Sequence, residues 1–148
     1  MTRPDIDWSQ TPAIRVDGLE AGRMVLEIAD GRPVRLVSTP GITGLAGAGW
    51  WAGLQNAWGN IATGPFLAVL DCADLPGLVL GALRAGCTDI AISPGPGIGD
   101  SVDTRLTSLT EAHGARLHRL SQPVTEVCWR RNRGATLRQH LTQVLDFK

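Results

Sequence analysis

Three short segments of the sequence combine hydroxyl, carboxylate and glycine residues directly after an apolar run. They are residues 38–44, 71–74 and 93–101. Hydroxyls and main-chain N–H groups at a helix start bind phosphate or carboxylate groups. A carboxylate can act as a general base, a metal ligand or a phosphoacceptor. The sequence therefore indicates two chemistries, anion binding and acid–base catalysis.

Eight residues of these segments are the candidates for the site. The candidate catalytic residues are Asp71 and Asp74. The candidate ligand-binding residues are Ser38, Thr39, Ser93, Gly97, Gly99 and Ser101. No metal site is predicted, because the three cysteines and three histidines show no ligand spacing, and no cofactor is predicted.

Each segment also has a purely structural interpretation. Asp74 would cap the following helix, and the glycines would serve a rigid strand–helix connection. Residues 93–101 match neither the dinucleotide-binding fingerprint nor the P-loop, and Pro94 and Pro96 have no N–H to offer an anion. Both interpretations stay open on the sequence alone.

The elements that must position these segments alternate along the chain. Apolar runs at 34–38, 65–70 and 89–93 predict strands, and helices are expected at about 46–61, 75–85 and 101–113. Such alternation is typical of a parallel sheet flanked by helices. If the three strands are parallel, their carboxyl ends share one edge, where ligands bind in open α/β sheets.

The fold class expected is α/β, a single domain over residues 1–148 with a mainly parallel sheet of four to six strands. Residues 24–29 and 34–38, joined by Asp30-Gly31, predict a β-hairpin that would add an antiparallel edge. Residues 1–22 are expected to be an extended lead-in, with 13–16 as a short strand. Further strands are expected at 116–120 and 124–130. Residues 134–148 are expected to hold a C-terminal amphipathic helix.

Two resemblances to known families follow from the apolar runs. Residues 66–93, which include the phrase Ala82-Leu-Arg-Ala-Gly86, resemble one βαβ unit of aldolase-type (β/α)₈ barrels. A complete barrel takes about 250 residues, so this chain is too short to close one alone. The expected element order, with Val69-Leu70-Asp71 ending a strand, resembles the STAS domain, whose Asp-Ser phosphoacceptor pair has no counterpart at Asp74-Leu75.

Composition narrows the class of protein. The net charge is zero, but from Arg116 onward seven basic residues face two acidic ones. Within that region Trp129-Arg130-Arg131 are candidates to bind a phosphate or a single-stranded base. A solvated strand end is the favoured interpretation, and nucleic-acid binding is not expected. No apolar run is long enough for a membrane span. With no apolar N-terminal segment and no paired cysteines, we expect a cytoplasmic protein.

Two functions are weighed from these patterns. The first is a non-catalytic binding or assembly module, with a protein partner or a homo-oligomer. It is motivated by the apolar helix at 75–83 and by Trp50, Trp51 and Trp58 on one helix. The alternative is a small-molecule site for a phosphate or carboxylate ligand, or a lyase- or hydrolase-like enzyme, at the carboxyl ends of the parallel strands. The first is slightly favoured.

Overall fold

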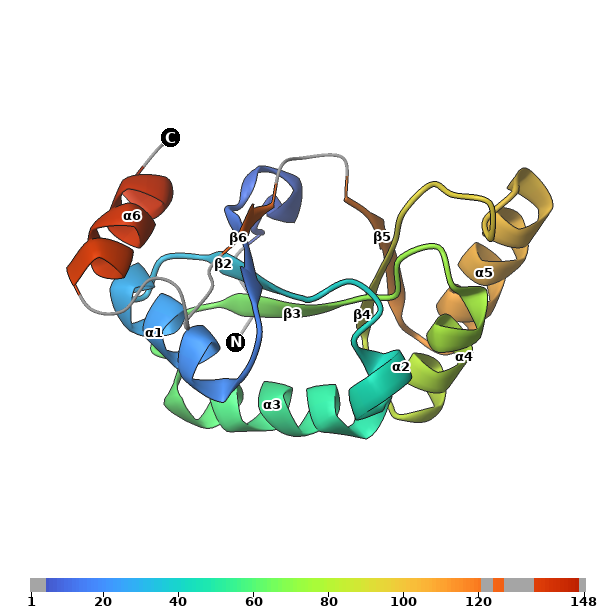
Figure 1. The fold of residues 1–148 in the computed structure, drawn as a ribbon, viewed down its shortest axis with the longest axis horizontal. Coiled ribbons are helices and arrows are strands. Elements are labelled where there is room, and N and C mark those ends of the chain that lie inside the picture. Colours follow the sequence, from blue (N-terminus) through green and yellow to red (C-terminus); the bar gives the residue numbers. More distant parts are fainter. Residues whose placement is uncertain (1–4, 121–123, 127–134, 147–148) are drawn as a thin grey trace.

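The structure, a computed structural model, describes residues 5–120, 124–126 and 135–146 and has an α/β fold (Figure 1). Its strands form one sheet in the order β5-β4-β3-β2-β1-β6, and every strand pairing is parallel. The expected parallel sheet flanked by helices is therefore confirmed. The strands are β1 (Ala13–Val16), β2 (Val34–Ser38), β3 (Phe66–Asp71), β4 (Asp89–Ile92), β5 (Arg116–Arg119) and β6 (Thr125–Glu126).

The helices follow the strands in regular alternation up to β5. A short 3₁₀ helix, η1 (Trp8–Gln10), precedes β1. The α-helices are α1 (Leu19–Ala29), α2 (Thr43–Ala46), α3 (Ala48–Ile61), α4 (Pro76–Arg84), α5 (Asp100–Ala112) and α6 (Ala135–Asp146). The segment expected as an extended lead-in thus holds η1, β1 and the start of α1.

All of the longer helices pack on one face of the sheet. From β1 to β5 each strand lies next to its predecessor, and right-handed crossovers then place every connecting helix on the same side. One apolar cluster joins inward residues of α1, α3, α4, α5 and α6 to one set of alternating strand residues, such as Ile14, Leu36 and Leu70. Figure 1 shows α1, α3 and α4 below the strands.

The opposite side of the sheet, which we call the helix-free face, carries the other set of alternating residues. Its apolar part consists of Ala13, Val37, Leu67, Val69 and Ala91. In the described part of the chain it is covered by Trp8 of η1 and by Leu120 and Val124. Sequential parallel strands with helices on one side are also the architecture of (β/α) barrels, in which the helix-free side is the interior.

The predicted N-terminal hairpin is wrong. Residues 24–29 are the last turns of α1, and Asp30 and Gly31, with φ of 48° and 85°, end that helix. A left-handed pair of this kind serves a helix C-terminus as well as a tight hairpin turn. The spacing of the buried residues Ala21, Val25 and Ala29 is helical. β2 is consequently an inner strand, and the element order loses its similarity to the STAS domain.

The tryptophan-bearing helix lies largely within the core. Trp51 and Trp58 of α3 are fully buried and pack edge to face, with ring centroids 5.3 Å apart. Gly22 of α1 makes room for Trp58, because a Cβ at that position would lie 2.2 Å from the indole ring. Trp50 of the same helix is partly buried, and Ile61 at its end is exposed.

Candidate functional site

The three predicted site segments meet at one edge of the sheet, which we call the carboxyl rim (residues 38–44, 71–74 and 93–101). β2, β3 and β4 are neighbouring parallel strands, so their carboxyl ends lie together. The Gly41 N–H donates to the Asp71 carbonyl oxygen at 2.9 Å, and the Ser93 N–H donates to the Ala73 carbonyl oxygen at 3.0 Å. The expectation of a common edge is correct.

Asp71 is the best-anchored side chain of the carboxyl rim. It is only 2% exposed, and its Oδ2 lies 3.0 Å from Arg15 Nη1. Its Oδ1 accepts the Ala73 N–H at 2.9 Å, and its own N–H donates to Ser38 Oγ at 2.8 Å. Arg15 also donates to the Ser38 carbonyl oxygen. The carboxylate is therefore held by charge and hydrogen bonds from within the chain.

Sequence reasoning missed Arg15, although a signal was present. Arg15 is the only charged residue of a four-residue strand whose other members are buried and apolar. A charge in such a strand needs a partner, because an unpaired buried charge is costly. The partner lies 56 positions away in sequence, on β3, so the pair could not be assigned before the strand order was known.

Asp74 lies against two of the rim glycines. A Cβ at Gly97 would be 2.0 Å from the Asp74 carbonyl oxygen, and one at Gly95 would be 2.4 Å from its Oδ2. Glycine is therefore required at both positions for one loop to pack on the other. The N-cap of α4 is Leu75, without a side-chain cap bond, so Asp74 does not cap the helix.

The N-terminus of α5, where an anion was expected, is acidic. Asp100 and Asp103 stand in its first turn, and the Asp74 carboxylate lies beside Gly95. Of the predicted ligand-binding residues, Gly99 and Ser101 are exposed and Thr39 and Ser93 are half-buried. Ligand binding by these residues stays a prediction, and the carboxylates of Asp74 and Asp100 disfavour an anion there.

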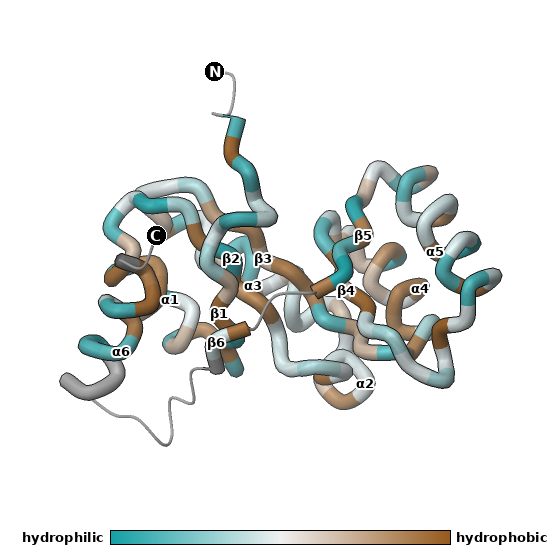
Figure 2. The backbone as a smooth tube through the Cα atoms, turned by 90° about the horizontal axis from the view of Figure 1, so that it is seen from above, coloured by the Kyte–Doolittle hydropathy of each residue, from teal (hydrophilic) through white to brown (hydrophobic). Residues whose placement is uncertain are grey.

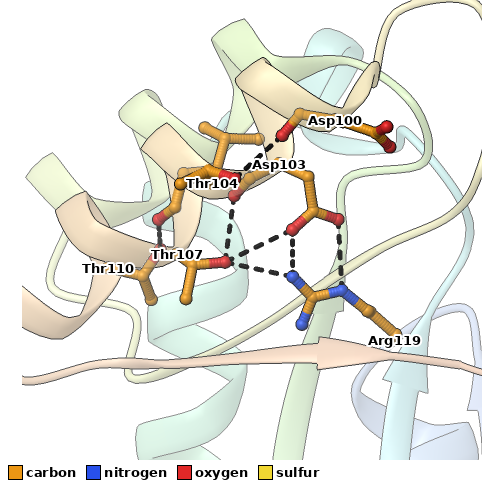
Figure 3. Close-up of polar contacts among 7 residues, drawn as sticks. Asp100, Asp103, Thr104, Thr107, Thr110 and Arg119 are labelled. Carbon is orange, nitrogen blue, oxygen red and sulfur yellow. Dashed lines mark hydrogen bonds and ion pairs between the residues drawn. The ribbon is translucent and has the colours of Figure 1, made fainter.

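Arg119 of β5 fastens the first turns of α5 to the sheet (Figure 3). Its Nε donates to Asp103 Oδ2 at 3.2 Å, and its Nη2 donates to Asp103 Oδ1 and, at 3.0 Å, to Thr107 Oγ1. The hydrogen bond from Arg119 lowers the pKa of Asp103. The guanidinium of Arg119 is thus hydrogen-bonded to α5, and the carboxylate of Asp103 balances its charge.

Arg35 is a buried arginine with a very different environment. It is the second residue of β2, it is 8% exposed, and it lies on the helix-free face beside Ala13. Its Nε and Nη2 donate to one acceptor, the Thr11 carbonyl oxygen, at 3.1 and 2.9 Å. No carboxylate pairs with it among the side chains that the structure describes. Burial lowers the pKa of Arg35.

Two cavities meet at Arg35. The larger, of about 440 Å³, lies at the amino ends of β1 and β2 beside α6. Its lining is mostly polar and neutral: Ser9, Gln10, Thr11, Pro12, Ala13, Arg35, Thr125, His140, Gln143 and Val144. The smaller, of about 150 Å³, lies over the helix-free face and is lined by Trp8, Ser9, Ala13, Arg35, His118, Arg119, Leu120 and Val124.

The smaller cavity also contains a histidine held by a buried carboxylate. His118 of β5 is 20% exposed, and its Nε2 lies 2.9 Å from Oδ1 of Asp89, which is 4% exposed. Arg116 Nε approaches the same oxygen at 2.9 Å. Burial acts to raise the pKa of Asp89, but the hydrogen bond from His118 and the charge of Arg116 outweigh it and lower that pKa.

The two features that motivated assembly are mostly accounted for within the chain. Figure 2 shows α4 as more hydrophobic than the neighbouring α5, but Val79, Ala82 and Leu83 are buried in the core, which leaves Leu75 and Leu80 exposed. A homo-oligomer or protein partner stays a prediction. The arginine-rich segment at 129–133 lies outside the described residues.

Thiol and metal chemistry gain no support in the described ranges. Burial, together with the charge of Asp71 and the neighbouring Cys87, raises the pKa of Cys72 to about 12, so its thiol stays protonated. Residues 5–120, 124–126 and 135–146 contain no group of three His, Cys, Asp or Glu side chains placed to hold a metal ion. None of their helices has the length and apolar character to cross a membrane.

Comparison with known proteins gives no family for this chain. No protein-family model matches the sequence, and no curated protein matches it.

Proposed function

We propose that this chain binds a small organic anion, through a carboxylate or phosphate group, at Arg35. The observation that carries the proposal is that Arg35, a residue only 8% exposed, lines two cavities and is paired with no described carboxylate. Burying a charge is costly unless an opposite charge or hydrogen bonds compensate it. A bound anion would supply the missing charge.

The lining of the larger cavity supports this choice of ligand. A volume of about 440 Å³ falls in the range of small-molecule sites. Ser9, Gln10 and Gln143 supply neutral hydrogen-bonding groups without an opposing charge. Arginine presents its N–H groups as a planar fork that matches carboxylate and phosphate oxygens, and this geometry favours an anion over a neutral ligand.

Two other regions offer less for an anion. A groove of about 760 Å³ lies between α3 and the amino ends of β3 and β4, but its ionic groups, Asp89 and Arg116, neutralise each other. At the carboxyl rim, Arg15 is paired with Asp71. Arg35 differs from Arg15 and Arg116 in having no described acidic partner, and this difference supports Arg35 as the residue that binds the anion.

The proposal is tested by calorimetric titration of the protein with inorganic phosphate, acetate and succinate at constant ionic strength. Arg35→Met should weaken the preferred probe at least about tenfold, because a charge-assisted hydrogen bond contributes roughly 1.5–3 kcal/mol. The affinity of Arg35→Lys for this probe should lie between those of wild type and Arg35→Met, because lysine keeps the positive charge but lacks the planar pair of N–H donors.

The matched control is Arg23→Met, which removes an exposed arginine paired with Glu20 on α1. It should leave the affinity unchanged. Preference for phosphate over succinate would identify the phosphate class, and the reverse would identify the carboxylate class. Absence of binding by all three probes, or equal binding by Arg35→Met, would contradict the proposal.

A further inference from the structure

We infer that His118 and Asp89 transfer a proton to and from the anion that Arg35 holds, so that the chain catalyses proton transfer on a carboxylate substrate with an acidic C–H bond. The inference rests on the proposed anion site and adds an activity to it. It is carried by one juxtaposition: His118 and Arg35 line the same cavity of about 150 Å³, although they come from β5 and β2.

The histidine is oriented for this role. Asp89 Oδ1 lies 2.9 Å from Nε2 of His118, and a second donor, Thr88 Oγ1, reaches Asp89 Oδ2 at 3.2 Å. A carboxylate on Nε2 favours the tautomer that carries its hydrogen there and leaves Nδ1 as an acceptor. Nδ1 has no hydrogen bond to any described group, so it is the ring nitrogen available to take a proton.

The charges around the cavity are divided between binding and acid–base roles. Arg119 lines it but is committed to Asp103 on α5. Arg116 is committed to Asp89. Arg35 is the lining cation with no described acidic partner. Apart from Arg119 and His118, the other described lining residues are apolar or neutral: Trp8, Ser9, Ala13, Leu120 and Val124. A carboxylate on Arg35 would therefore lie in a small cavity beside a base.

The substrate class follows from these two anchors and the small volume. The ligand needs a carboxylate for Arg35 and, within a few atoms, a C–H bond acidified by a carbonyl group. Short 2-oxo acids meet both needs. In the step, His118 Nδ1 takes the proton from the carbon next to the carbonyl, the C–H electron pair forms a C=C bond, and the π pair of the carbonyl moves onto its oxygen. Return of the proton to carbon restores the acid, so no oxidant or second reactant is required.

The test follows the exchange of carbon-bound hydrogen in heavy water by proton NMR, with pyruvate and 2-oxobutyrate as probes. The protein should replace the hydrogens on C3 with deuterium faster than buffer alone, by about a hundredfold if His118 acts as a general base of ordinary efficiency. His118→Gln should lose this acceleration and still bind the probes in calorimetry, because the glutamine amide can replace Nε2 as the donor to Asp89.

Three further variants distinguish the positioning of His118 from the binding of the anion. Asp89→Asn should reduce exchange while probe binding persists, as expected of a positioning residue. Arg35→Met should lose both binding and exchange. His113→Gln is the matched control, because His113 is exposed at the end of α5 and its ring is hydrogen-bonded to the Leu109 carbonyl oxygen, away from Asp89. Exchange should be unaffected.

Each result decides the inference. Wild-type protein that binds either probe but exchanges no faster than buffer overturns it and leaves the anion site standing. Exchange that survives His118→Gln overturns it as well. Binding of phosphate without binding of either 2-oxo acid removes the proposed substrate class. Failure of every anion to bind removes the proposed function together with this inference. If His118→Gln does not fold, the wild-type exchange rate alone still decides.

Discussion

Arg15 at the carboxyl rim and Arg35 at its two cavities are both largely buried, but of the two only Arg15 is paired with a described carboxylate. At the rim, Asp71 is held by Arg15 and by the Ala73 N–H, and Asp74 fills the space left by Gly95 and Gly97. At Arg35 a buried guanidinium shares a single carbonyl acceptor and lines open volume. In the first region the cation and the carboxylate are paired, whereas in the second no described carboxylate pairs with the guanidinium.

The comparison teaches that position at a strand end does not by itself make a site. In open parallel sheets the carboxyl edge is the usual place for ligands, and the polar segments here do converge on it. Asp71 is already bound to Arg15 and Ser38, and Asp74 packs on Gly95 and Gly97, so these residues join the loops of the rim. Thr43 Oγ1 is the rim side-chain atom that is buried without a described hydrogen-bond partner, and it is neutral. A buried charge without a described counter-charge therefore indicates an anion site better than residue type does.

The largest expected effect is the contrast in stability between Arg15→Met and Arg35→Met. Arg15→Met leaves Asp71 buried without its cation and should lower the free energy of unfolding by about 3–5 kcal/mol. Arg35→Met removes a charge that has no acidic partner among the described side chains. The free energy of unfolding should fall by less than about 1.5 kcal/mol, because only the hydrogen bonds to the Thr11 carbonyl oxygen are lost.

Urea denaturation followed by circular dichroism at pH 7 measures both values. Adding Asp71→Asn to Arg15→Met should recover part of the loss, because it removes the unpaired charge. Equal losses for the two arginine variants would erase the distinction between the regions.

The next effect concerns the packing of loops at the rim. Gly97→Ala drives a Cβ to within 2.0 Å of the Asp74 carbonyl oxygen, and should cost about 1–3 kcal/mol of stability by overpacking. Gly99→Ala is the control two positions on, since nothing lies within 4 Å of a Cβ there. Thermal unfolding of the two variants should separate them clearly, and a tolerated Gly97→Ala would show that the rim is not a tight joint.

A smaller effect is expected from acid. The pKa of Asp89 is lower in the folded chain than its ordinary value, so its contribution to stability is fully present above about pH 4 and is lost as the pH falls through the folded value. Asp89→Asn should therefore lose less stability than wild type between pH 5 and pH 2.5, measured by urea midpoints at each pH. A parallel fall in the two proteins would exclude Asp89 as an anchored carboxylate.

The smallest effect is expected for the ligand-binding residues predicted at the rim. Thr39→Ala and Ser101→Ala should change the affinity for phosphate or succinate less than twofold, because the carboxylates of Asp74 and Asp100 lie at that edge. The titration used for Arg35 measures this directly. A tenfold loss in either variant would return the anion site to the carboxyl rim.

Much of the fold was predictable because its signals are local. The apolar runs that became β2, β3 and β4 were located from composition alone. The last turns of α4 and α5 were marked by Gly86 and Gly114, which adopt φ of 82° and 69°. The wrong hairpin arose because two local signals were ambiguous. Asp30-Gly31 can end a helix as well as turn a hairpin, and over residues 24–29 the apolar residues fit both the period of a helix and that of a strand.

The sequence by itself determined the alternation of strands and helices from β2 to β5, whereas part of helix α1 was mistaken for a strand. Because parallel strands end at one edge of a sheet, this alternation also predicted that three polar segments meet there. Only the tertiary structure decided which charges are paired. Arg15 meets Asp71 across 56 residues and Asp89 meets His118 across 29, while Arg35 meets no described carboxylate. Pairing depends on strand order and on which face each residue occupies, and those are properties of the assembled sheet.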